Sequence, residues 1–122
     1  MTISLSLPLD PVPKARPRLG KFGTYTPRRT KQFETDLKTL VKIKYKGEPL
    51  SGPLHMALTF SFREPKKPKN KIHVTRPDLD NLQKAVFDGL NGILWVDDCQ
   101  IFSCHAIKKY GKEPKIEISV WA

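Results

Sequence analysis

The stretch Arg76–Ile101, RPDLDNLQKAVFDGLNGILWVDDCQI, carries the strongest structural signal in the chain. Apolar residues recur in it at spacings of three and four positions, at Leu79, Leu82, Val86 and Leu90. This period is that of an amphipathic helix, so we predict a helix over residues 79–91 with one face on the core. Gly92 marks its end, and a short apolar run follows before two aspartates.

Other segments on both sides of this helix have a strand or helix period. Alternating apolar residues predict strands at residues 2–7, 55–62, 99–110 and 115–121. A second helical stripe begins at Pro27 and ends near Lys46 and Gly47. Residues 110–114 are predicted to form a hairpin turn, and residues 72–75 a short extended piece. Two basic, proline-containing segments show neither period and are predicted as loops: residues 10–26 and 63–71.

The element order is therefore β-α-β-α-β-β. Two helices on one face of a mixed four- to five-stranded sheet is the economical packing, which is an α+β two-layer sandwich. A length of 122 residues allows one domain, predicted to span residues 1–122. The order of the strands in the sheet does not follow from the pattern.

The net charge of +10 is concentrated in one part of the chain. Residues 1–75 hold 16 basic and 5 acidic residues, a net of +11, whereas residues 76–122 hold 6 and 7, a net of −1. Such a basic segment indicates a polyanionic partner, most simply nucleic acid. The alternatives are a solubilising surface or a ribosome-bound basic protein.

Several classes of protein are disfavoured by composition. No apolar run approaches the roughly 20 residues of a membrane span, and the N-terminus lacks the pattern of a signal peptide. Cys99 and Cys104 are too far apart on one continuous strand for a disulfide, and no Cys/His cluster suggests a zinc site. We therefore expect no membrane partner and a reducing, cytoplasmic setting.

The acidic residues of the quoted stretch form the candidate chemical site. Asp78 and Asp80 lie at the predicted helix start, where an extended chain would point both to the same side. Lys84 follows Asp80 by four residues, so it shares the face of that aspartate. Asp97 and Asp98 lie at a predicted turn, from which a carboxylate can come back close to Asp78 and Asp80.

Carboxylates without His or Cys make a hard oxygen site, which suits Mg²⁺, or Mn²⁺ as a substitute, rather than zinc. In a basic protein, such a site fits hydrolysis of a phosphodiester, whose charge must be offset and whose attacking water must be activated. Lys84 could hold a phosphate oxygen or orient the nucleophile.

A purely structural interpretation of the same residues stays open. Asp80 and Gln83 fit a helix capping box, Asp97 and Asp98 fit ordinary turn residues, and Lys84 fits a solvated surface lysine. On the residue pattern alone, a nuclease and a non-catalytic nucleic-acid-binding protein both remain.

The quoted stretch resembles the signature region of the RusA family of Holliday-junction resolvases. The resemblance lies in Asp-Leu-Asp-Asn-Leu-x-Lys at the helix start and in Trp-x-Asp-Asp-x-Gln after it, and the flanking elements match as well. It implies a Mg²⁺-dependent endodeoxyribonuclease that cuts four-way DNA junctions symmetrically in DNA recombination and repair. It further implies a homodimer and no small-molecule cofactor beyond the metal. Family members are often prophage-encoded.

The resemblance also assigns roles to residues of the stretch. Asp78, Asp80 and Asp98 correspond to the metal-binding catalytic aspartates, and Lys84 to the essential lysine. Asp97 corresponds to the adjacent acidic position and is included among the metal ligands. The same residues would serve a nuclease acting on flaps, forks or RNA, so that alternative stays open. The candidates for the dimer interface are the apolar stripe of the first helix and the exposed side of the sheet.

The basic residues of the two loops are the candidate DNA contacts, since phosphate contacts give affinity without sequence information. They are Lys14, Arg16, Arg18, Lys21, Arg28, Arg29, Lys66, Lys67, Lys69, Lys71 and Arg76. Phe22 and Tyr25, interleaved with these residues, could stack on unpaired bases or could pin the first loop to the core. His73 lies five positions before Asp78 and is kept as a residue near the site.

Overall fold

The fold is seen in a computed structural model that describes residues 2–122. Met1, the first residue of the predicted domain, lies outside the described residues. The elements in chain order are β1 (Thr2–Leu7), β2 (Arg18–Gly20), β3 (Gly23–Tyr25), α1 (Arg28–Lys44), β4 (Leu54–Arg63), α2 (Leu79–Leu90), the 3-10 turn η1 (Asp98–Gln100), β5 (Ile101–Gly111) and β6 (Lys115–Trp121).

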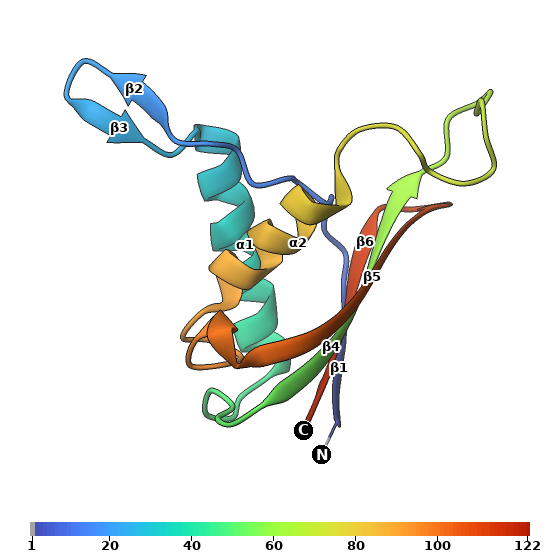
Figure 1. The fold of residues 1–122 in the computed structure, drawn as a ribbon. Helices are drawn as coiled ribbons and strands as arrows, with labels where there is room; N and C mark the ends of the chain where they lie inside the picture. Colours follow the sequence, from blue (N-terminus) through green and yellow to red (C-terminus); the bar gives the residue numbers. More distant parts are fainter. Residues whose placement is uncertain (1) are drawn as a thin grey trace.

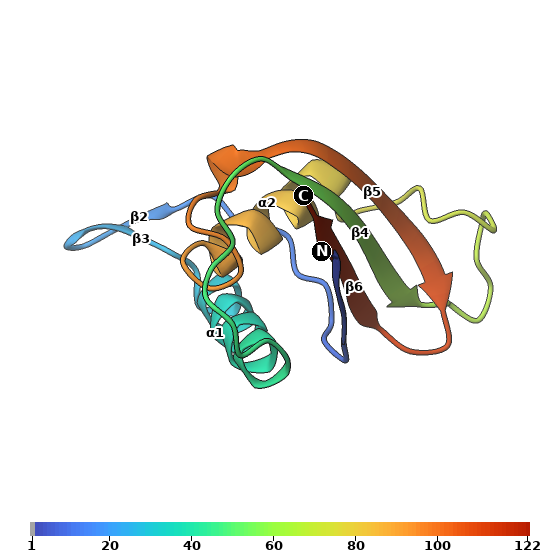
Figure 2. The same ribbon diagram turned by 90° about the horizontal axis from the view of Figure 1, so that it is seen from below.

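Four strands form one mixed sheet in the order β1-β6-β4-β5. β4 pairs in parallel with β5 and antiparallel with β6, and β6 pairs antiparallel with β1. Both helices cover the same face of this sheet, and the other face carries no helix (Figures 1 and 2). The predicted α+β two-layer sandwich is therefore confirmed.

The core lies between the helices and the covered face of the sheet. β4 and β6 alternate buried and partly exposed residues, as their sequences predict. The buried residues of α1 include Phe33, Leu37 and Val41. The apolar stripe of α1 is therefore used inside the protomer, which removes it as a candidate dimer interface and leaves the uncovered face of the sheet.

The predicted hairpin between the last two strands is wrong. β4 lies between β5 and β6 in the sheet, so the connection at residues 112–114 crosses over the end of β4. Two strand spacings amount to about 10 Å, which three extended residues can span. Alternation in a sequence indicates that a strand is half buried, but it does not identify the neighbouring strand.

Residues 10–26, predicted as a loop, contain the small hairpin of β2 and β3. Gly20 pairs with Gly23, which adopts a φ of +113° that favours glycine. Three residues per strand are too few to show a period, which explains why the sequence did not predict them. Residues 72–75, predicted as a short extended piece, form no strand.

The loop between β4 and α2 is attached to the sheet close to the start of α2. Lys108 on β5 donates through Nζ to the carbonyl oxygens of Thr75 at 2.7 Å and Pro77 at 3.0 Å. The ring of His73 lies between those of Phe62 and Tyr110, with centroids 4.5 and 4.8 Å away. These contacts fix the segment that leads into α2.

Two further expectations concern the setting of the protein. Cys99 and Cys104 are both free, as predicted, although Cys99 lies in η1 rather than on the strand. Over residues 2–122 no helix is both long and apolar enough to cross a membrane.

Stability should fall on mild acidification because His73 resists protonation. Its side chain is 6% exposed, and burial, with a further contribution from Lys108, lowers the pKa of His73 from its ordinary value of 6.5. As the pH falls below about 6.5, the unfolded chain takes up the proton first, so the stability present at higher pH is lost.

We expect His73→Phe to reduce the loss of unfolding free energy between pH 7 and lower pH, measured by urea denaturation. His105→Phe, which changes an exposed histidine on β5, is the control and should keep the wild-type slope. Identical pH dependence in wild type and His73→Phe would contradict this account.

Candidate functional site

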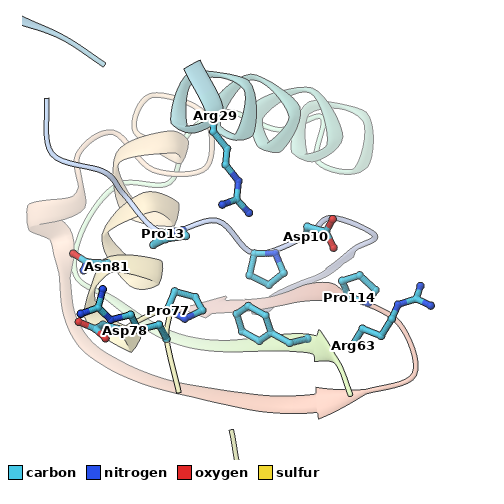
Figure 3. A pocket seen from close by; sticks show the side chains of 11 residues that line it. Asp10, Pro13, Arg29, Arg63, Pro77, Asp78, Asn81 and Pro114 are labelled. Atoms are coloured by element: carbon cyan, nitrogen blue, oxygen red, sulfur yellow. The ribbon is translucent and has the colours of Figure 1, made fainter. Parts of the chain in front are cut away.

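A cavity of about 830 Å³ opens beside the start of α2. It lies between the segment after β1, the start of α1, the end of β4 and the segment that leads into α2 (Figure 3). Its charged lining residues are Asp10, Arg29, Arg63, Arg76 and Asp78. Arg29 points from α1 into the cavity, whereas the guanidinium of Arg63 points outward. The positive charge of Arg29 and Arg76 in the lining favours an anionic ligand such as a phosphate.

Asp78 lines this cavity and keeps its carboxylate available. It is the N-cap residue of α2, yet its side chain makes no capping hydrogen bond. Its backbone carbonyl accepts from the N–H of Leu82 at 3.2 Å, so the backbone alone begins the helix. The side chain is exposed and can serve a ligand without loss of a structural contact.

Asp80 is exposed and does not line the cavity that Asp78 lines. The helix begins at Leu79, so Asp80 lies in its first turn, where its Oδ1 accepts from the N–H of Asn81 at 2.9 Å. The two aspartates are therefore not on one extended segment, in contrast to the prediction. The alternative capping box of Asp80 with Gln83 is not formed, because the N-cap is Asp78.

Lys84 lies one helical turn after Asp80 on the outer side of α2. It is exposed, and the ion pairs found in residues 2–122 do not include it. Its ammonium can therefore move toward a ligand bound near the start of α2.

Asp97 has a structural use at η1. Its Oδ1 accepts from the N–H of Cys99 at 3.1 Å, and its own N–H donates to Gln100 Oε1 at 2.8 Å, which forms a capping box. The backbone hydrogen bond from Cys99 lowers the pKa of Asp97. Gln100 in turn donates to the carbonyl oxygens of Leu50 and Gly52. The turn interpretation of Asp97 thus has a direct geometric basis.

Asp98 lies at the opposite end of α2 from Asp78. Its Oδ2 accepts from Asn91 Nδ2 at 3.4 Å, and Asn91 follows the last residue of the helix. Burial raises the pKa of Asp98, and the neighbouring charges of Asp97 and Asp88 add to this effect, against the hydrogen bond from Asn91.

The predicted carboxylates are therefore divided between the two ends of α2. A helix of 12 residues is about 18 Å long. Across residues 2–122, no group of three or more His, Cys, Asp or Glu side chains is placed to hold a metal ion. The reason is a tight turn after α2, in which the N–H of Gly92 donates to the carbonyl oxygen of Trp95 at 2.7 Å. The chain returns to the start of α2 only further along β5, at Lys108.

Lys14, predicted as a DNA contact, instead cross-links the two helices. Its Nζ lies 2.6 Å from Glu34 Oε1 on α1 and 3.6 Å from Asp88 Oδ2 on α2. Burial acts against its charge, but the hydrogen bond and charges of these carboxylates outweigh it and raise the pKa of Lys14. Its N–H also donates to the carbonyl oxygen of Asn81 at 2.9 Å. Its ammonium is thus occupied by protein ligands.

The other basic candidates are exposed, on two projecting arms and, for Arg28 and Arg29, at the start of α1. In Figure 1 the β2–β3 hairpin and the yellow-green loop after β4 extend from the same end of the molecule, on opposite sides of the start of α2. In the part of the chain described, these side chains make no ion pairs: Arg16, Arg18, Lys21, Arg28, Arg29, Lys66, Lys67, Lys69, Lys71 and Arg76.

Three positions near the cavity were not predicted from the sequence. Arg63 could have been found as the charged end of a buried strand, because it leads directly into the second basic loop. Asp10 and Lys108 carry no comparable signal, since only the folded chain places them beside the segment that leads into α2.

Comparison with known proteins identifies the family. The family model described as "Endodeoxyribonuclease RusA" matches residues 8–121. The chain is also 30% identical over 128 residues to a protein of Bacillus subtilis (strain 168) with the name "Uncharacterized protein YqaN", a match that covers 91% of this chain and 89% of that protein. These matches extend over nearly all the elements described above, and the chain belongs to the RusA endodeoxyribonuclease family.

Proposed function

We propose that the protein is a Mg²⁺-dependent endodeoxyribonuclease that resolves four-way DNA junctions by paired nicks and acts as a homodimer inside the cell, in recombination and repair. Family membership supports a nuclease of this kind. The observation that carries the proposal is the free carboxylate of Asp78, which lies in a cavity lined by arginines and between two basic arms.

The residues at the start of α2 suit Mg²⁺ in their chemistry. This ion commonly uses one or two carboxylates together with water and substrate phosphates, rather than a complete protein cage. Asp78 and Asp80 would hold it, and Mn²⁺ would substitute. When bound, the ion would offset the charge of the phosphodiester and activate the attacking water.

The protein's own groups have separate tasks in this scheme. Arg29 and Arg76 line the cavity and would hold the phosphates next to the cleaved bond. Lys84 would hold a phosphate oxygen or orient the nucleophile from the outer side of α2. The remaining basic residues of the two arms would contact the DNA backbone, while Lys14 would act by keeping α1 and α2 together.

Two arguments support the proposed homodimer, one from the substrate and one from the fold. A four-way junction has two-fold symmetry, so two equal sites related by a two-fold axis would make two equal cuts. In addition, Asp98 lies about one helix length from Asp78 within a protomer. We propose that Asp98 of one protomer approaches the start of α2 in the other. The uncovered face of the sheet and the β5 edge are the surfaces left for such an association.

The replacement Asp78→Asn should abolish cleavage but not folding, because this carboxylate caps nothing. We expect nicking of a synthetic four-way junction in Mg²⁺ to fall on the order of 100-fold or more. Junction affinity should stay the same or increase, since charge repulsion with the phosphates is relieved. Asp36→Asn on α1, which changes an aspartate that does not line the cavity, is the matched control.

Full cleavage by folded Asp78→Asn protein would contradict the role of this carboxylate. Equal loss of binding and cleavage would favour a residue that only positions DNA. A wild-type protein that binds junctions but does not cut them would favour the non-catalytic alternative. Preferential cutting of flaps, forks or RNA would keep the chemistry and change the substrate.

Two substitutions can separate a role of Asp97 in metal binding from its role as the cap of η1. Asparagine caps as well as aspartate, so Asp97→Asn should leave the unfolding free energy unchanged, whereas Asp97→Ala should lower it by about 1 kcal/mol. Because the Asp97 Oδ1 is already used by Cys99, we expect Asp97→Asn to weaken Mn²⁺ binding less than Asp98→Asn, as measured by calorimetry. An equal or greater loss for Asp97→Asn would make Asp97 a principal ligand.

A further inference from the structure

The β2–β3 hairpin exposes apolar side chains at the end of a projecting arm. The strand pairing leaves Lys21 and Phe22 at its tip, between Gly20 and Gly23. Phe22 is 97% exposed, Leu19 is 86% exposed and Tyr25 is 51% exposed. The sequence left two alternatives for Phe22, which were stacking on unpaired bases and packing of the loop against the core. Packing of Phe22 against the core is therefore wrong.

The base of the hairpin is held firmly close to the candidate site. The N–H of Lys14 donates to Asn81 on α2, and the N–H of Ala15 donates to the buried Thr30 on α1 at 3.4 Å. Within the hairpin, the Tyr25 ring lies close to Gly20, where a Cβ would be 3.0 Å from Tyr25 Cδ1. The chain that leads into the arm is thus anchored to both helices, and the Tyr25 ring packs against Gly20 within the hairpin.

The charge around this apolar tip fits a nucleic acid. From Pro11 to Phe33 the sequence contains seven basic residues and no acidic residue. The ammonium of Lys21 lies 5.8 Å from the centroid of the Phe22 ring. A phosphate held by Lys21 would therefore lie beside a base stacked on Phe22, which is the arrangement of exposed bases along a sugar-phosphate chain.

We propose that this hairpin recognises the branch point of the DNA, with Phe22 stacked on a base that has lost its stacking partner at the crossover. Arg18 and Lys21 hold the phosphates on either side of that base. This inference rests on the proposed function and deepens it, because it assigns the preference for branched DNA to a part of the chain away from the carboxylates. Intact duplex offers no such base, so the contact distinguishes a junction from its arms.

The test is equilibrium binding to a four-way junction and to a duplex of the same sequence, measured by fluorescence anisotropy in the non-cutting Asp78→Asn background. We expect Phe22→Ala to weaken junction binding about 5- to 100-fold, the range for loss of one base–aromatic stack, and to leave duplex binding unchanged. Phe22→Trp should restore it. Arg18→Gln should weaken both and reduce the salt dependence.

The matched control is Ile43→Ala on α1, which removes another exposed apolar side chain, 60% exposed in the structure, and should change neither affinity. Unchanged junction binding by Phe22→Ala, or an equal loss for junction and duplex, would overturn the inference. A Phe22→Ala variant that loses binding only to vesicles containing anionic lipid, and not to junction DNA, would also overturn the inference. If the Asp78→Asn protein with Phe22 intact does not prefer the junction over the duplex, the proposed function fails. If that protein prefers the junction and Phe22→Ala does not change this preference, only the inference about the hairpin fails.

Discussion

The packing of α2 against α1 determines where the candidate carboxylates at the two ends of α2 lie. Gly89 approaches α1 so closely that a Cβ there would be 3.0 Å from Leu37 Cδ2. Leu82, Val86 and Leu90 on α2 are completely buried, so the helix cannot rotate or slide without exposing core surface. A rigid helix held in this way gives fixed positions to the acidic residues at its two ends.

The same packing explains how an acidic site can exist in a protein with a net charge of +10. Lys14 bridges Glu34 on α1 and Asp88 on α2 and offsets part of their negative charge. Asp78 is left free at the start of α2, where Arg29 and Arg76 line the same cavity and a basic arm extends on either side. The positive charge around Asp78 would thus attract a phosphate backbone. A bound cation would then offset the repulsion between the phosphate and the Asp78 carboxylate.

The sequence predicts the parts of this structure that depend on local period, and it misses those that depend on long-range contacts. The stripe of Leu82, Val86 and Leu90 defined α2 to within one residue, because helix burial follows a fixed spacing. The insertion of β4 between β5 and β6 has no local signal. The position of Lys14 between two carboxylates and the distance of Asp98 from Asp78 likewise depend on tertiary packing, so composition and motif spacing could not provide them.

Mixing two inactive variants tests most directly the proposal that the two ends of α2 form one site in a dimer. Asp78→Asn and Asp98→Asn proteins are each assayed alone, then unfolded together, refolded and assayed on a four-way junction in Mg²⁺. If the site is shared between protomers, mixed dimers regain one intact site, and about one site in four becomes active. We expect single-strand nicking to return to about a quarter of the wild-type rate. A mixture no more active than either variant alone would contradict the shared site.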